Sequence, residues 1–176
     1  MRAPAVETHV AYWLAPAFPA REFLVELIVD LAARYDAPPF EPHVTLYSSR
    51  EKPEVAREIL SRTAAGFSPI SLVVRGVEYS KKFTKTLFVQ FEPDLRLSQL
   101  SQTLREASSH PRDYELNPHL SLLYAKIPDR EKATLARSLQ LAFKQLRFDA
   151  VKVISAPRQT KNDQDVRAWR ILTSGL

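Results

Sequence analysis

Two segments of the chain repeat one short pattern: proline, then histidine, then apolar residues alternating with a hydroxyl residue. The segments are Pro42-His43-Val44-Thr45-Leu46 and Pro118-His119-Leu120-Ser121-Leu122. Side chains alternate across a β-strand, so His43 and Thr45 share one face of their strand while the apolar residues share the other. His119 and Ser121 repeat this arrangement. The duplication favours two α+β lobes related by an approximate two-fold axis, each contributing one such strand.

Coincidence is a poor explanation of this repeat. A single histidine on a strand is usually structural, held by a backbone partner or exposed to solvent. Two of the four histidines carry the pattern, an outcome that chance composition produces in only about 0.4% of cases. His9 and His110 lack the pattern, and we interpret them as ordinary surface or edge residues.

The repeated residue types suit the opening of a phosphodiester. An oxygen nucleophile that attacks phosphorus must lose a proton to a base, and the departing oxygen must gain a proton from an acid. Imidazole, with an unperturbed pKa of about 6.5, serves either role near neutral pH. Hydroxyl groups donate to the non-bridging oxygens, where negative charge gathers in the transition state. Side by side along a cleft, His43, His119, Thr45 and Ser121 supply both proton transfers and the phosphate contacts.

Composition removes several other classes of chemistry. Cysteine is absent, which excludes disulfides, thiolate zinc sites and a cysteine nucleophile. No HExxH motif or close acidic grouping accompanies either repeated histidine. The three glycines cannot assemble a P-loop or a GxGxxG fingerprint. We therefore expect neither a metal ion nor another cofactor.

The net charge of +5, from 25 basic and 20 acidic residues, favours anionic partners such as nucleotides or RNA, without the density of a polybasic arm. The N-terminus lacks the apolar core of a signal peptide. The most apolar stretch, 23–33, is interrupted by Glu26 and Asp30 and is too short to span a bilayer. We expect a cytoplasmic monomer with no membrane partner.

Hydrophobic periodicity predicts alternating strands and helices along the chain. The expected strands cover 8–15, 43–48, 70–79, 83–91, 119–124, 148–155 and 166–173. The expected helices cover 19–35, 53–65, a segment that begins near Asp94 and includes Leu104, and 129–146. A polar loop over 157–165 joins the last two strands. No Gly/Ser linker or low-complexity tract divides the chain, so we expect a single domain over 1–176.

His43-Val44-Thr45-Leu46 and His119-Leu120-Ser121-Leu122 resemble the twin HxTx/HxSx motifs of the 2H phosphoesterases. The segments Tyr12-Trp13-Leu14-Ala15-Pro16 and 119–125, together with Trp169, are similar to the plant and yeast cyclic phosphodiesterase branch. The resemblance covers nearly the whole chain in order and spacing. It implies an α+β bilobal fold, with two pseudo-symmetric lobes whose antiparallel sheets line a central cleft and whose helices lie outside.

The same resemblance implies an enzyme that opens cyclic phosphates without a metal ion. In that branch, ADP-ribose 1″,2″-cyclic phosphate gives ADP-ribose 1″-phosphate, and nucleoside 2′,3′-cyclic phosphates give nucleoside 2′-phosphates. By motif match, His43 and His119 are the acid–base pair, with His119 activating water and His43 protonating the leaving oxygen. Thr45 and Ser121 match the phosphate-binding positions.

Three aromatic residues, Tyr124, Trp13 and Phe83, match substrate-binding positions of that branch. Trp13 shares its strand face with His9, so we expect its ring either in the cleft, or in the core or the interface between the lobes. Phe83 lies among lysines, which suits either a nucleotide-facing edge or a solvated hairpin. A surface role is the simpler interpretation of Lys85.

Three functions compete at this point. The leading hypothesis is a cyclic phosphodiesterase whose partner is a small-molecule cyclic phosphate or nucleotide. The second is an enzyme that acts on RNA ends, as a 2′,3′-cyclic phosphodiesterase or a 2′-5′ RNA ligase-like protein. The third is a nucleotide- or RNA-binding module that has kept the cleft and lost turnover. The absence of a dense basic stripe argues against extended RNA, and the presence of both histidines and both hydroxyls argues against the third.

Overall fold

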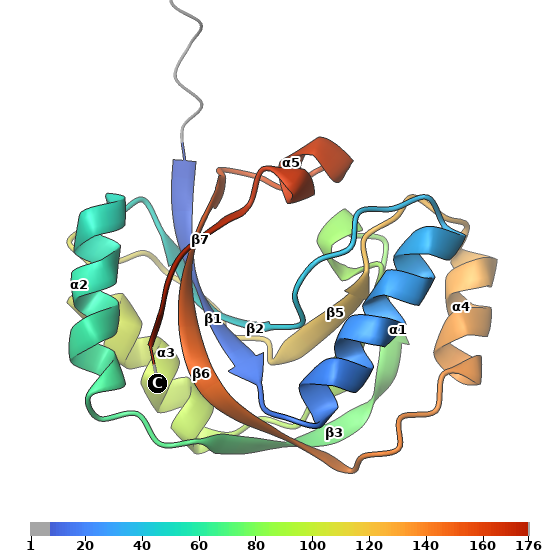
Figure 1. Ribbon diagram of the computed structural model, residues 1–176, viewed down its shortest axis with the longest axis horizontal. Coiled ribbons are helices and arrows are strands. Elements are labelled where there is room, and N and C mark those ends of the chain that lie inside the picture. Colours follow the sequence, from blue (N-terminus) through green and yellow to red (C-terminus); the bar gives the residue numbers. More distant parts are fainter. Residues whose placement is uncertain (1–7, 176) are drawn as a thin grey trace, which may run out of the picture.

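The computed structural model describes residues 8–175, and seven strands lie at its centre (Figure 1). The strands are β1 (Thr8–Pro16), β2 (Val44–Ser49), β3 (Ile70–Tyr79), β4 (Leu87–Phe91), β5 (His119–Leu123), β6 (Gln145–Pro157) and β7 (Arg170–Gly175). The helices are α1 (Ala20–Arg34), α2 (Pro53–Ala64), α3 (Leu95–Ala107), α4 (Asp129–Ser138) and α5 (Asp163–Arg167), with a 3-10 turn η1 (Phe83–Lys85). The α+β class expected from the sequence is confirmed.

The strands form two antiparallel groups that meet at two places. One group contains β2, β1, β6 and β7, and the other contains β5, β4 and β3. The long strand β6 joins them on one side, because its first residues pair with β3 and the rest pairs with β1. On the other side, β2 and β5 share the single residue pair Val44–Leu120. The sheet is therefore strongly curved, and its concave face opens upward in Figure 1.

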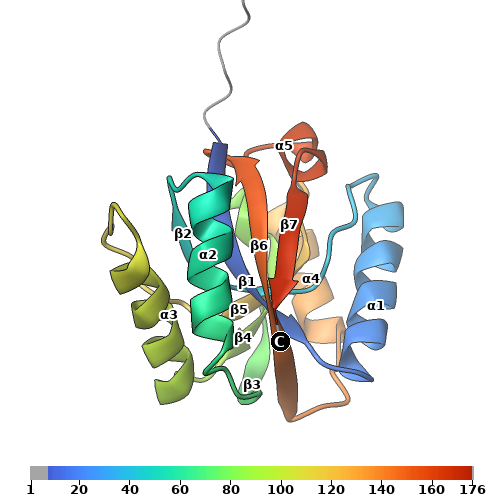
Figure 2. The same ribbon diagram turned by 60° about the vertical axis from the view of Figure 1, so that its left-hand side comes forward.

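The helices cover the outer faces, and their placement does not follow the two halves of the sequence. Helices α2 and α3 pack on β6, β7 and β2, whereas α1 and α4 pack on β5 and β3 (Figure 2). Thus α1, from the first half of the chain, packs on β5, which belongs to the group of β3 and β4. Helix α3, from the second half, packs on β2 in the other group. The lobes are pseudo-symmetric in space but interlocked in sequence.

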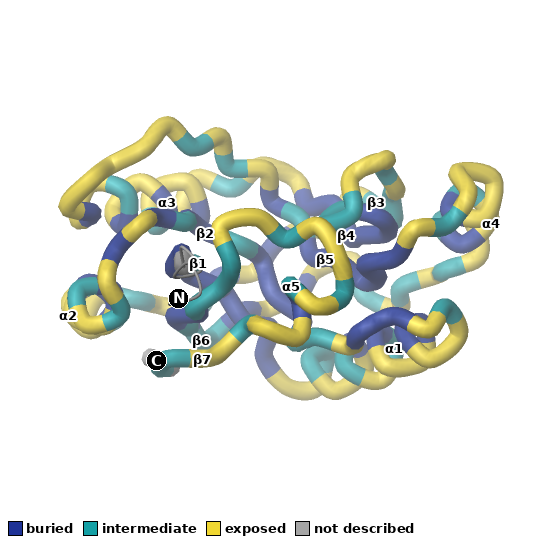
Figure 3. Tube along the Cα trace, turned by 90° about the horizontal axis from the view of Figure 1, so that it is seen from above, coloured by how far each residue is buried: buried dark blue, intermediate teal, exposed yellow. Residues whose placement is uncertain are grey.

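Burial follows the alternation read from the sequence. On β1, Val10, Tyr12 and Leu14 are buried in the hydrophobic core, while Trp13 faces the opposite side. Figure 3 shows buried residues along the central strands, with the outward turns of the helices exposed. Among the described residues, no helix is long and apolar enough to cross a membrane.

Three predicted boundaries are wrong. Helix α4 ends at Ser138 rather than near residue 146, because the backbone turns extended at Leu139 and lets Phe143 pack edge-on against Phe23 at 5.2 Å. Val166 does not begin the last strand, because an Asn162–Asp165 capping box starts the short helix α5. Phe83 lies in the turn η1, and β4 begins only at Leu87.

Candidate active site

The repeated strands meet at their equivalent positions. Val44 and Leu120, each the residue after a repeated histidine, pair across the β2–β5 junction, and both are fully buried. Because side chains alternate, the neighbours of this pair point to the concave face. Continuing the antiparallel register by one residue sets the position of His43 across from that of Ser121. The pseudo-two-fold axis therefore passes between the two repeats.

A cleft of about 860 Å³ lies on that face and is lined by six of the seven predicted site residues. They are His43, Thr45, His119, Ser121, Trp13 and Tyr124. The seventh, Phe83, lines a neighbouring pocket, although its ring centre lies 5.9 Å from that of Tyr124. The structure thus brings together residues that lie more than a hundred positions apart in the sequence.

Both imidazoles are held in the same orientation by backbone carbonyls two residues earlier. Nδ1 of His43 lies 2.7 Å from the carbonyl oxygen of Glu41, and Nδ1 of His119 lies 2.8 Å from that of Asn117. A carbonyl oxygen only accepts, so Nδ1 carries a proton in each ring. Each Nε2 is then the atom available to exchange a proton with a ligand.

The two residues that hold the imidazoles are themselves bonded to side chains of other strands. Gln90 on β4 donates to the side-chain oxygen of Asn117 at 2.9 Å and to the carbonyl oxygen of Pro118 at 2.9 Å. The Lys152 ammonium on β6 donates to the Glu41 carboxylate at 2.5 Å. Each imidazole is therefore positioned through an intermediate residue by a polar side chain of another strand.

His43 is part of an aromatic wall. The Trp13 ring is stacked on it with ring centres 3.6 Å apart and planes within 6° of parallel. The Trp169 ring packs edge-on against both, 5.1 Å from Trp13 and 5.9 Å from His43. Phe40 stacks on Tyr124 at 4.1 Å and continues the wall. His43 is only 6% exposed, yet its neighbours are cleft residues and not the hydrophobic core.

The pKa values of both histidines are lowered. For His43, burial is the largest cause, opposed by the hydrogen bond to Glu41 and reinforced by the charges of His119 and Lys152, and its pKa falls to about 3. For His119, burial is again the largest cause, and the ammonium groups of Lys85 and Lys82 lower its pKa further. Both rings are therefore neutral near pH 7 in the ligand-free protein.

The hydroxyl groups differ in their present contacts. Ser121 Oγ donates to the carbonyl oxygen of Thr84 at 2.9 Å. The Thr45 side chain lines the cleft, while its backbone carbonyl accepts a hydrogen bond from the Tyr114 hydroxyl at 3.3 Å. Burial raises the pKa of Tyr124 to about 12, which keeps its hydroxyl protonated near neutral pH. The cleft therefore contains several neutral donors beside the two imidazoles.

Cationic side chains also line the cleft. They are Lys82, Lys85, Arg158 and Lys161. The Lys85 ammonium lies 4.3 Å above the Phe88 ring. Burial lowers the pKa of Lys85, and the nearby charge of Lys82 lowers it further. A low-dielectric cleft lined by positive charge attracts an anionic ligand. Lys85 was expected at the surface, but the structure places it in the cleft wall.

Other cleft residues were missed in the sequence. His9 is buried, at 7% exposed, and lines the cleft instead of lying at an ordinary surface. His9 lies four residues before Trp13 on the same strand, so the alternation that turns Trp13 toward the cleft also predicts that His9 faces the cleft. Trp169, which contributes to the resemblance, and Tyr114 have no such local signal for a cleft position, because both lie in loops.

Among the described residues, no three histidine or acidic side chains are arranged so that they could hold a metal ion. The chemistry available at the cleft is therefore that of two oriented imidazoles, several hydroxyl donors and a positive rim. This set of groups can bind a phosphate ester and move protons to and from its oxygens.

The fold is that of the 2H phosphoesterases. Over 95% of its length the chain matches E. coli LigT complexed with 3′-AMP, covering 96% of that chain, at 13% identity and a TM-score of 0.58. The same coverage holds for a protein of Thermus thermophilus, at 19% identity and a TM-score of 0.61. Kluyveromyces marxianus Usb1 matches over 99% of this chain and 100% of its own, at 11% identity and a TM-score of 0.50.

The family comparison is more specific than the fold. The model of the 2′-5′ RNA ligase superfamily matches residues 16–160, and the chain belongs to that superfamily. A search of curated proteins finds no match.

Proposed function

We propose that the protein is a cyclic phosphodiesterase that uses His43 and His119 as its acid–base pair and needs no metal ion. The observation that carries the proposal is the matched orientation of the two imidazoles, each with Nδ1 bonded to a carbonyl and Nε2 available. Thr45 and Ser121 would contact the non-bridging phosphate oxygens. The proposed substrates are nucleoside 2′,3′-cyclic phosphates, opened to 2′-phosphates, and ADP-ribose 1″,2″-cyclic phosphate, opened to the 1″-phosphate.

The proposed step is an in-line displacement at phosphorus. Nε2 of one histidine takes a proton from water as the water oxygen bonds to phosphorus. The bond from phosphorus to the ribose 3′ oxygen breaks, and the other histidine gives that oxygen a proton. Two imidazoles on opposite sides of the phosphate meet this requirement, since attack and departure occur on opposite sides. Each proton transfer contributes a factor of about 10²–10⁴ to the rate.

We assign His119 to water and His43 to the leaving oxygen. The parallel Trp13 ring supports this direction, because an aromatic face stabilises an imidazolium that lies against it. Burial opposes it in the ligand-free protein by lowering the pKa of His43. A bound phosphate anion raises the pKa of nearby imidazoles, so the substrate itself promotes the uptake of the proton that the acid must donate.

RNA ends are the second candidate substrate. The superfamily is named for 2′-5′ RNA ligation, and the cationic cleft suits a polynucleotide end as well as a mononucleotide. Proteins named LigT and Usb1 share the fold. The cleft residues proposed for hydrolysis would serve this substrate unchanged, so the two candidates differ in what lies beyond the scissile phosphate.

Removal of metal ions is expected to leave turnover unchanged. Protein treated with EDTA would be assayed with a nucleoside 2′,3′-cyclic phosphate, the ADP-ribose cyclic phosphate and an RNA with a 2′,3′-cyclic end, and ³¹P NMR would identify the products. A nucleoside 2′-phosphate in chelator supports the proposal. Turnover that disappears in EDTA and returns with a divalent ion would contradict the metal-independent chemistry, and turnover of the RNA alone would favour the second candidate.

Gln90→Leu is expected to lower kcat by about tenfold with little change in KM, because misorientation of a catalytic ring slows the chemical step more than it weakens binding. The substitution removes the hydrogen bonds that hold Asn117 and Pro118 beside His119. Gln102→Leu, on the exposed side of α3, is the matched control and should leave kcat unchanged. Nitrogen NMR of His119 separates the effects, because the Nδ1-protonated tautomer should lose population in the Gln90 variant. An unchanged tautomer and kcat would show that Gln90 does not position the ring.

A further inference from the structure

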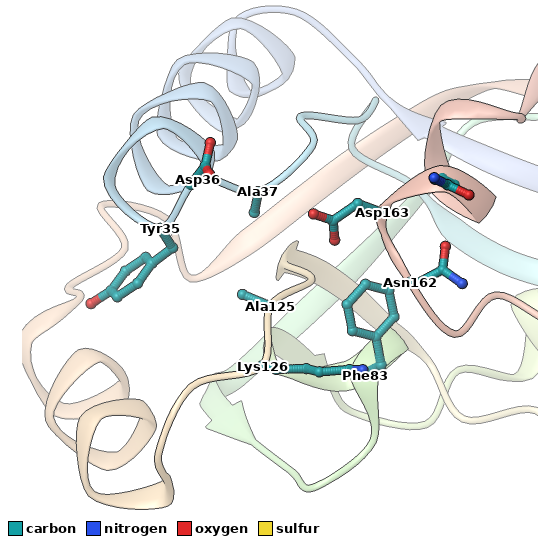
Figure 4. Close-up of a pocket in the computed structure, with 9 residues that line it drawn as sticks. Tyr35, Asp36, Ala37, Phe83, Ala125, Lys126, Asn162 and Asp163 are labelled. Carbon is teal, nitrogen blue, oxygen red and sulfur yellow. The ribbon is translucent and has the colours of Figure 1, made fainter.

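A second hollow, of about 520 Å³, lies beside the cleft and shares none of the residues that line it. Its walls come from the end of α1, the turn η1, the segment after β5 and the start of α5 (Figure 4). We call it the Asp163 pocket, after the acidic residue that points into it, and its other principal residues are Tyr35, Asp36, Phe83, Lys126 and Asn162.

The pocket and the cleft are two sides of one wall. Tyr124 lines the cleft, and the next two residues line the pocket. Lys82 and Thr84 line the cleft, while Phe83 between them lines the pocket, with its ring centre 5.9 Å from that of Tyr124. Lys161 lines the cleft and Asn162 lines the pocket. The pocket therefore adjoins the cleft, and Tyr124, Phe83 and the 161–162 turn form the boundary between them.

The segments that form the pocket are held by internal hydrogen bonds. Asn162 Oδ1 accepts from the Asp165 amide at 3.1 Å, and Asp165 Oδ2 accepts from the Lys161 amide at 2.8 Å, which fixes the turn on which Asp163 stands. The carbonyl of Phe83 accepts from the Thr86 hydroxyl at 2.8 Å. The aromatic ring and the carboxylate are therefore presented by ordered turns.

The charges of the pocket select against a phosphate. Figure 4 shows the Asp163 carboxylate pointing into the hollow toward Ala37, with the Phe83 ring below it. Within the described part of the chain, no hydrogen bond or ion pair occupies that carboxylate. Asp36 adds a second negative charge at the end of α1, and Lys126 adds one positive charge. A flat ring stacked on Phe83 that donates hydrogen bonds to Asp163 satisfies both features.

We propose that the Asp163 pocket binds the base of the nucleotide substrate and prefers bases that carry an exocyclic amine. The proposal rests on the proposed function, because the cyclic phosphate in the cleft delivers the base to the pocket. Cytosine presents an amine at the position where uracil presents a carbonyl oxygen, and a carboxylate accepts from the first and repels the second. The class of preferred substrate is thus an amine-bearing nucleoside cyclic phosphate, with uridine disfavoured.

Cytidine and uridine 2′,3′-cyclic phosphates are a minimal pair for the test. The wild-type protein is expected to favour cytidine in kcat/KM by about tenfold, within the range for a good base-edge contact. Asp163→Asn should bring the ratio near one, because an amide also donates to the uracil oxygen. Asp30→Asn removes an exposed negative charge of α1 that does not line the pocket, and it should keep the wild-type ratio. Phe83→Leu should lower kcat/KM for both substrates by about tenfold, through lost stacking.

Calorimetric binding of the same two compounds to the His43→Ala/His119→Ala variant gives the test independence from turnover. Tighter binding of the cytidine compound, abolished by Asp163→Asn, supports the pocket. If the wild-type protein hydrolyses neither compound, that absence of turnover counts against the proposed function and not against the pocket. Equal affinities and equal kcat/KM for the pair, or a cytidine preference that Asp163→Asn leaves intact, would overturn the pocket assignment.

Discussion

Alanine at His43 or at His119 is expected to lower kcat by at least about 10²-fold, because each change removes one of the two proton transfers that the proposed displacement requires. The effect should appear in kcat more than in KM, since the two proton transfers occur in the transition state and not in the bound ground state. Steady-state kinetics on a nucleoside 2′,3′-cyclic phosphate measure it. His110→Ala, an exposed histidine outside the cleft, is the control and should behave as wild type.

A substrate with sulfur in place of the bridging 3′ oxygen separates the two roles. Sulfur leaves without protonation, so the variant that lacks the acid should recover activity on it and the variant that lacks the base should not. The proposed direction requires recovery by His43→Ala. Recovery by His119→Ala instead would reverse the assignment. If neither variant recovers and both keep near wild-type activity on the oxygen substrate, the two histidines are not the acid–base pair.

Acidification is expected to destabilise the fold from about pH 6.5 downward, by about 3 kcal/mol between pH 7 and pH 4 from His43 alone. The pKa of this imidazole is about 3 in the folded protein and 6.5 as a model group. Between these values the unfolded chain binds more protons than the folded chain, so the free energy of unfolding falls as the pH falls. The stabilisation is fully present above pH 6.5. His119, whose pKa is also lowered, contributes in the same direction.

Urea unfolding at a series of pH values measures this dependence. His43→Phe keeps a ring against Trp13 and removes the titrating group, so its free energy of unfolding should depend less on pH between 6.5 and 4.5 than that of the wild type. The comparison uses slopes, and it therefore tolerates a lower overall stability of the variant. Identical slopes for the variant and the wild type would show that His43 is not buried as a neutral ring.

The strands around the site were predictable because their local patterns agree with their tertiary environment. The repeat at Val44 and Leu120 specified two strands with apolar backs, and the alternation around Trp13 specified which face of β1 meets the cleft. What the pattern could not supply is the pairing of the two repeats through one residue pair, since register across a junction depends on the whole curved sheet.

The wrong boundaries arose where helical spacing and tertiary packing disagree. The spacing of Leu135, Leu139 and Phe143 fits a continued helix, yet the last two pack on the core from an extended segment after α4. At α5, the Asn162–Asp165 pair is a local start signal for a helix within the segment that the polar composition predicts to be a loop. Trp169 enters the aromatic wall only because α5 and β7 fold back over the cleft, an arrangement that no local pattern encodes.

The site has two halves that are equivalent in position and unequal in geometry. Trp13 pairs with Thr45 on one side and Phe88 pairs with Ser121 on the other, so each phosphate-binding candidate has an aromatic neighbour at the equivalent place. The first aromatic ring stacks flat on His43 at 3.6 Å, whereas the second meets His119 edge-on at 5.6 Å. This difference is the structural basis on which we expect the two imidazoles to divide the acid and base roles.

Catalysis by the two histidines is tested most directly by comparing the wild-type protein with the His43→Ala/His119→Ala variant on a nucleoside 2′,3′-cyclic phosphate, in EDTA and with both proteins purified in parallel. Circular dichroism and the unfolding midpoint would first establish that the variant is folded. We expect the wild-type protein to form the nucleoside 2′-phosphate and the variant to form it at least about 10²-fold more slowly. Near wild-type turnover by the folded variant would contradict the assignment of His43 and His119 as the acid–base pair.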